Sequence, residues 1–135
     1  MDVVTAITRD HRLIESLIDD LAEGGRPWLL TELKARIAAH AAGEDHVYGT
    51  AYHGAHERDE TVETIAAAER AEGTERYAEA LAECAATLRE HVDEEERDVL
   101  PRLAKAVPEE RLEDLGRAFE DGRAAELRRS GVEPG

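Results

Sequence analysis

Apolar residues recur alternately three and four positions apart along most of the chain, which is the spacing that lines one face of an α-helix. Glycine and proline interrupt this pattern at residues 24–27, 49–54, 73 and 108. The pattern therefore predicts five helices, over residues 2–23, 28–49, 55–72, 74–106 and 108–129. We expect the tail, residues 130–135, to fray.

Three of the predicted helices carry a stripe in which a histidine interrupts an apolar run. The first stripe is Val4, Ile7, His11, Ile14, Ile18 and Leu21. The second is Leu30, Leu33, Ile37, His40, Glu44, Val47 and Ala51. The stripe of helix 74–106 is Tyr77, Leu81, Cys84, Leu88, His91, Glu95 and Asp98.

Helix 55–72 has two weaker stripes, one of Val62, Ile65 and Glu69 and the other of His56, Glu60 and Glu63. Short connections make consecutive helices antiparallel, so we predict an all-α, up-down-up-down four-helix bundle over residues 1–106. Residues 107–135 add a C-terminal helix whose apolar side packs on the bundle or on a second copy of the chain; that side carries Leu112, Leu115 and Phe119. We expect a monomer or a weak homodimer.

Charge and composition restrict the partners. The chain has 32 Asp and Glu against 17 Lys and Arg, a net charge of −15, so we expect neither nucleic acid nor an anionic membrane as a partner. No apolar run is long enough to span a bilayer. One cysteine cannot form an internal disulfide, and residues 1–12 lack a secretory signal pattern, so we expect a cytoplasmic protein.

Two stripes place an imidazole and a carboxylate one helical turn apart on a buried face. These pairs are His40 with Glu44 and His91 with Glu95. A buried carboxylate without a partner costs several kcal/mol. The same pair at the same phase of two stripes is poorly explained by core packing, whereas a metal cation would compensate both carboxylates.

Helix register gives an independent indication. His11 lies 12 residues before the end of its helix and His40 lies 12 after the start of the next, so antiparallel packing brings them to one level. By the same reasoning His56 and His91 meet, each 16 residues from the 72–75 connection. His53 would miss that level by three residues, about 4.5 Å. Two half-sites with nitrogen and oxygen ligands predict two metal ions, with Fe, Mn or Zn as the candidates.

The motifs that carry these residues resemble the hemerythrin-like family of the HHE cation-binding type. They are Asp10-His11-Arg12, His40-x-x-x-Glu44-Asp45, His56 in Gly54-Ala55-His56-Glu57, and the run from Arg89 to Pro101 that contains His91 and Glu95. The resemblance covers about residues 3–105. It implies a non-haem centre of two iron ions, bridged by an oxygen atom or by carboxylates, with terminal ligands His11, His40, His56 and His91 and bridging ligands Glu44 and Glu95. It further implies reaction with dioxygen, nitric oxide or peroxide.

The chain departs from the oxygen-carrying hemerythrins on its third helix. Those proteins have a His-x-x-x-His pair, whereas here His56 is followed four residues later by Glu60. His53, Glu60, water or Tyr48 would complete the second iron site. Tyr48 is equally well interpreted as a packing aromatic with its hydroxyl near the site.

Three functional hypotheses remain. The first is a di-iron protein that reacts with a small oxidant, most concretely hydrogen peroxide in a catalase-like dismutation, or dioxygen. The second is a module that binds or senses oxygen, nitric oxide or iron without turnover. The third is a metal-free acidic helical bundle, which the coincident histidine registers disfavour.

Overall fold

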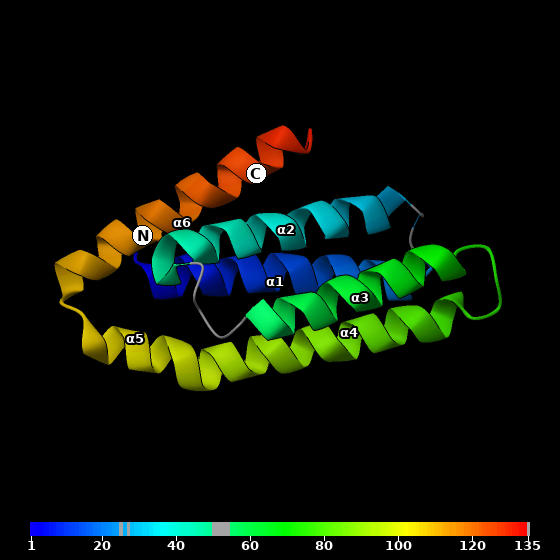
Figure 1. The fold of residues 1–135 in the computed structure, drawn as a ribbon, viewed down its shortest axis with the longest axis horizontal. Helices are drawn as coiled ribbons and strands as arrows, with labels where there is room; N and C mark the ends of the chain where they lie inside the picture. Colours follow the sequence, from blue (N-terminus) through cyan, green and yellow to red (C-terminus); the bar gives the residue numbers. More distant parts are fainter. Residues whose placement is uncertain (25, 27, 50–54, 135) are drawn as a thin grey trace.

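The computed structural model describes residues 1–24, 26, 28–49 and 55–134, with residues 55–59 described by their backbone alone. Within that part the fold is entirely helical (Figure 1). The elements are α1 (Val3–Ala22), α2 (Trp28–Tyr48), α3 (Ala55–Ala71), α4 (Tyr77–Glu94), the π-helical turn η1 (Glu95–Val99), α5 (Leu100–Ala106) and α6 (Glu109–Arg129). Because α4, η1 and α5 follow one another without a break, the described chain forms five continuous helical segments. Each predicted helix end lies within three residues of the observed one.

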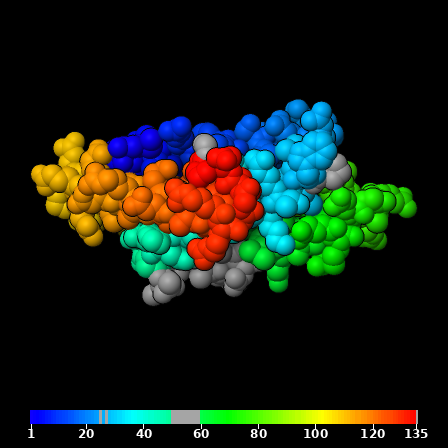
Figure 2. Space-filling view, turned by 90° about the horizontal axis from the view of Figure 1, so that it is seen from above, coloured from blue at the N-terminus to red at the C-terminus, as the bar shows by residue number. Residues whose placement is uncertain are grey.

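The helices lie side by side, and α1 contacts α2, α4 and α6. α3 packs mainly on α4, while α6 packs most extensively on α2. Figure 2 shows α6 and the tail lying across the face that α1 and α2 form. The predicted C-terminal helix therefore covers the bundle with its apolar side, on which Leu115 and Phe119 are buried.

Two separate apolar clusters form the core. The larger joins α1, α2, α3 and α4 around residues such as Ile14, Leu33 and Leu88. The smaller joins the start of α1, α5 and α6 around Ile7, Leu100 and Phe119. His11 lies between Ile7 and Ile14 on α1, so its side chain sits where one cluster ends and the other begins.

Two glycines let α6 approach α2 closely. A Cβ added to Gly43 would lie 2.7 Å from a ring carbon of Phe119, and one added to Gly122 would lie 2.8 Å from the His46 ring. A larger residue at either position would push α6 outward. This close packing brings residues of α6 within reach of the polar side chains between the clusters.

The π-helical turn corrects one prediction for the stripe of helix 74–106, the position of Asp98. Asp98 is exposed, whereas Glu95 and Leu100 are buried. The Leu100 N–H donates to the Glu95 carbonyl oxygen five residues earlier, so this turn contains one more residue than an α-helical turn and shifts the later residues around the axis. Pro101 follows the turn; it has no N–H to donate and crowds the carbonyl four residues before it, which favours a local irregularity here.

Of the two stripes predicted for the third helix, only Ile65 is buried among the described residues. The buried side of α3 carries Thr61, Ile65 and Ala68, while Val62 is 55 % exposed. Glu60, Glu63 and Glu69 are also exposed. The apolar residues of this segment are too few to determine its rotation, which the packing of α3 on α4 determines instead.

Residues 132–134 of the tail make hydrogen bonds that the sequence pattern does not predict. The Val132 N–H donates to the Leu127 carbonyl oxygen at 2.9 Å. Arg36 donates to the Glu133 carbonyl oxygen at 3.3 Å, and Arg123 donates to that of Pro134 at 2.8 Å. Arg36 of α2 and Arg123 of α6 thus hold a segment that has no periodic pattern of its own.

Among the described residues no helix combines the length and the apolar character that crossing a membrane requires.

Candidate metal centre

Two histidines and a glutamate from three helices meet between the apolar clusters. His11 comes from α1, His40 from α2 and Glu95 from η1, and one ligand atom from each lies within 4.8 Å of the others. The ring centroids of His11 and His40 are 4.8 Å apart. The predicted meeting of these two histidines at one level of the bundle is therefore confirmed.

Both imidazoles direct Nε2 toward the same carboxylate oxygen. Glu95 Oε1 lies 2.9 Å from His11 Nε2 and 3.8 Å from His40 Nε2. Glu44, one turn after His40, has Oε2 3.4 Å from the same His40 Nε2. Two imidazole nitrogens and two carboxylates thus converge, with both carboxylates buried.

The other nitrogen of each ring faces a second carboxylate. His11 Nδ1 lies 2.7 Å from Glu96 Oε2, and His40 Nδ1 lies 2.7 Å from Asp10 Oδ2. A carboxylate on Nδ1 favours the tautomer that keeps the proton there and leaves the Nε2 lone pair free for a cation. The arrangement is the one that metal-ligating histidines ordinarily have.

Arginines extend both of these contacts. Arg12 donates to Glu96 from the neighbouring position on α1. Arg123 of α6 donates through Nε to Asp10 Oδ1 at 2.8 Å. Each histidine therefore begins a chain of imidazole, carboxylate and guanidinium; we call His11–Glu96–Arg12 the surface relay and His40–Asp10–Arg123 the buried relay.

Burial and neighbouring charges shift the pKa values of the metal-free site. Burial raises the pKa of Glu44 to about 7, with Glu95 adding to the rise and His40 opposing it. Burial opposes ionisation of Glu95, but hydrogen bonds from Glu44, His11 and His40 hold its pKa well below the usual value. Between the two carboxylates, the site therefore favours the proton on Glu44 and the ionised form of Glu95.

His40 and Asp10 have opposite shifts. Burial disfavours the charged form of His40, but Glu44 and the hydrogen bond to Asp10 outweigh it and raise its pKa. Burial likewise opposes ionisation of Asp10, but His40 and Arg123 lower its pKa. Without a metal, the site therefore balances its carboxylates with protons and with Arg123.

Tyr48 lies beside this group. Its hydroxyl donates to Glu95 Oε2 at 3.2 Å, while Oε1 of the same carboxylate faces the histidines. Phe119 of α6 contacts the His40 ring edge-on at a centroid distance of 5.3 Å. The sequence-based choice for Tyr48 between ligand and neighbour stays open, with the hydroxyl placed at the site in either case.

His91 belongs to a second, smaller group. Its Nδ1 lies 2.9 Å from the Thr61 hydroxyl oxygen, and its Nε2 lies 3.4 Å from Glu60 Oε2. It is not among the three residues whose ligand atoms lie within 4.8 Å in the described part of the chain. His53 and the side chain of His56 lie outside the described residues, so the predicted meeting of His56 with His91 stays a prediction.

Four residues around the histidines were assigned no site role from the sequence: Asp10, Thr61, Glu96 and Arg123. A signal exists for two of them. Asp10 falls between the buried residues Ile7 and Ile14 at helical spacing, and Arg123 follows Phe119 by one turn. A charged residue at a buried helical position needs a partner. The spacing of Asp10 and Arg123 therefore indicates that both side chains are buried and paired.

Comparisons with known protein families, with curated proteins and with solved structures find no match to this chain. Conclusions on function therefore depend on the geometry of the site and on the chemistry of its residues.

Proposed function

We propose that the chain is a non-haem di-iron protein with up-down-up-down bundle topology that reacts with a small oxidant, hydrogen peroxide in the first place and dioxygen in the second. The observation that supports this best is that His11 and His40 both direct Nε2 toward Glu95 while a carboxylate occupies each Nδ1. Histidines that bind a metal almost always donate their other ring N–H to a carboxylate, a backbone carbonyl or water.

The charges of the site also favour a cation. Glu44 and Glu95 lie on the same imidazole, and without a metal Glu44 retains a proton up to about pH 7. A divalent cation replaces protons at such a site, because its ligands must be neutral imidazole and ionised carboxylate. Nitrogen and oxygen donors without a thiolate suit iron, manganese or zinc.

A second ion would use the group around His91. His91 Nε2 and Glu60 approach each other at 3.4 Å, and the Thr61 hydroxyl lies on the other ring nitrogen. His56 or His53 would supply the further imidazole. Glu44 and Glu95 are the proposed bridges, since both carboxylates face His40 Nε2 and Glu95 also follows His91 by four positions.

When bound, a pair of irons supplies the two electrons that peroxide chemistry exchanges. The chain contributes the surroundings. The two apolar clusters flank the site and restrict water, and the Tyr48 hydroxyl holds a proton against Glu95 where it can donate to a small ligand. Short connections between packed neighbours, α1 with α2 and α3 with α4, support the up-down-up-down topology.

Metal stoichiometry tests the proposal. After anaerobic reconstitution with Fe²⁺, elemental analysis should give about two irons per chain. Glu95→Ala should abolish tight binding of both, whereas Glu90→Ala, an exposed position on α4, should leave iron content unchanged. A wild-type protein that retains no iron would contradict the metal centre, and so would an iron content that neither substitution changes. One iron retained per chain would contradict only the dinuclear form of the centre.

Turnover tests the reaction. The iron-loaded protein should evolve oxygen from hydrogen peroxide over many cycles, measured with an oxygen electrode. A stable, reversible adduct of the ferrous protein with dioxygen or nitric oxide and no turnover would favour the sensing module instead.

A further inference from the structure

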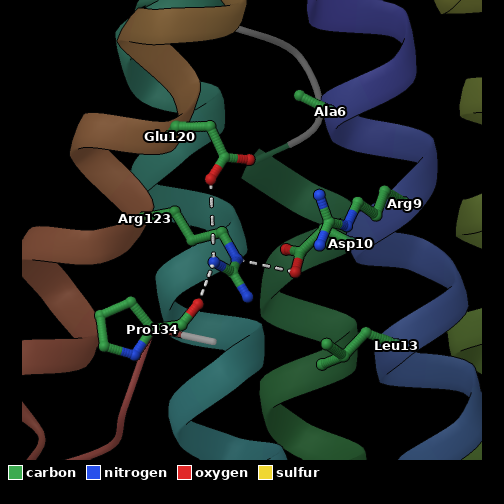
Figure 3. Close-up of a pocket in the computed structure, with 7 residues that line it drawn as sticks. All are labelled: Ala6, Arg9, Asp10, Leu13, Glu120, Arg123 and Pro134. Atoms are coloured by element: carbon green, nitrogen blue, oxygen red, sulfur yellow. Dashed lines mark hydrogen bonds and ion pairs between the residues drawn. The ribbon is translucent and has the colours of Figure 1, made fainter. Parts of the chain in front are cut away.

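Arg123 is a charged residue buried in the contact between α6 and α1. Its side chain is 7 % exposed, and that of its partner Asp10 is 3 % exposed. Figure 3 shows the guanidinium between Asp10 and the Pro134 carbonyl, with Glu120 on the side of α6. Nε donates to Asp10, while NH1 donates to Pro134 and lies 3.9 Å from Glu120.

The two oxygens of Asp10 face different partners. Oδ1 accepts from Arg123 Nε at 2.8 Å, and Oδ2 accepts from His40 Nδ1 at 2.7 Å. A carboxylate held on one oxygen by a guanidinium has little freedom to turn, because rotation would break one bond or the other. Its orientation therefore determines the direction of the His40 ring.

Phe119 restricts the same ring from another side. It contacts His40 edge-on from one turn before Arg123 on α6, and Gly43 permits that approach. Arg123 and Phe119 thus confine one imidazole from one helix. The effect is to keep Nε2 directed at Glu44 and Glu95.

We propose that Arg123 is a positioning residue of the metal centre: by holding Asp10, it fixes His40 in the tautomer and orientation in which Nε2 binds the metal. This rests on the proposed metal site. It makes α6 a part of that centre, although no residue of α6 is proposed as a ligand. The contact to Pro134 uses a different nitrogen, so holding the tail and holding Asp10 are separable roles.

Metal affinity with Co²⁺ as the probe tests the proposal, since its visible bands report the ligand geometry. Arg123→Met should weaken Co²⁺ binding by about tenfold, the lower end of the effect of residues that support ligands, and should change the spectrum. The Co²⁺ affinity of Arg123→Lys should lie between that of wild type and that of Arg123→Met. Arg117→Met, an exposed arginine on the same helix that pairs with Asp114, is the matched control and should match wild type.

A double-mutant cycle shows whether Arg123 acts through Asp10. In an Asp10→Asn background, Arg123→Met should cause no further loss of Co²⁺ affinity. An equal loss in both backgrounds would overturn the proposal, as would wild-type affinity and spectrum in Arg123→Met. Wild-type protein that binds no Co²⁺ would overturn the metal site itself, so the two failures are distinguishable.

The His40 ring provides a second measurement. In Zn²⁺-loaded protein, ring ¹⁵N chemical shifts should report a proton on Nδ1 and zinc on Nε2. In Arg123→Lys, which retains a charge and is the safer variant to fold, the His40 signals should shift or broaden while those of His11 stay. Unchanged His40 signals would contradict a positioning role.

Discussion

The two histidines of the site are held by relays of the same chemistry in different environments. In the surface relay, Arg12 and Glu96 have side chains 52 % and 24 % exposed. In the buried relay, Arg123 and Asp10 are 7 % and 3 % exposed. The carboxylate lies 2.7 Å from Nδ1 in both cases, so the difference between them is solvent.

Solvent changes what each relay contributes. An exposed ion pair is screened and contributes about 0–1 kcal/mol, whereas removing one partner of a buried pair costs about 3–5 kcal/mol because the other charge stays unpaired. Similar geometry therefore does not imply similar importance. We expect His40 to be held rigidly and His11 to depend more on its own packing.

The largest expected effect on the free energy of unfolding comes from removing Asp10, the carboxylate of the buried relay. In metal-free protein at pH 7, Asp10→Ala should lower the free energy of unfolding by about 3 kcal/mol or more, since it removes the buried carboxylate that accepts from both Arg123 and His40. Glu96→Ala should cost less, about 1–2 kcal/mol, because it removes a hydrogen bond to His11 Nδ1 and a screened ion pair but leaves the charge of Arg12 in solvent. Urea denaturation followed by circular dichroism measures both, and equal losses would contradict the distinction.

A smaller effect is expected from pH, acting on the buried relay and Glu44. Folding raises the pKa of Glu44 to about 7 and raises the pKa of His40, so the folded metal-free protein binds more protons than the unfolded chain from about pH 5 to pH 7. Its free energy of unfolding should therefore fall as pH rises across this window. Metal affinity should rise over the same window, because protons compete with the metal for its ligands.

Two substitutions check the origin of this slope in metal-free protein. Glu44→Gln should flatten it by removing one of the two groups, and Asp10→Asn should flatten it by removing a contact that raises the pKa of His40. Below about pH 4 the slope should reverse, since Asp10 and Glu95 have lowered pKa values and lose stabilisation when protonated. A free energy of unfolding that increases from pH 5 to 7 without metal would show that folding does not raise the pKa values of His40 and Glu44.

The smallest effect is expected at Arg12. Arg12→Met should change the Co²⁺ affinity by less than about threefold and the free energy of unfolding by less than about 0.5 kcal/mol. Any difference between Arg12→Met and wild type should disappear in 0.5 M NaCl, because salt screens an exposed ion pair. Isothermal titration at low and high salt measures this; a tenfold loss like that expected for Arg123→Met would show that burial is not what separates the relays.

The site combines features that sequence patterns could and could not predict. The approach of His11 to His40 followed from counting residues to a short connection, because antiparallel neighbours have one register once their turn is known. The phase of Asp98 did not follow, because the π-helical turn shifts it without an apolar signal. The buried side of α3 also did not follow from the sequence, because the helix has too few apolar residues to determine it.

The sequence by itself determined the helical spans and the buried stripes of α1, α2 and α4, and it brought His11, His40, Glu44 and Glu95 into consideration. These depend on local periodicity, which a helix translates directly into faces. The tertiary structure alone decided which carboxylate meets each Nδ1 and that α6 reaches the site. Those contacts join residues 85 and 113 positions apart, and their geometry depends on the rotation and close approach of packed helices, which no local spacing encodes.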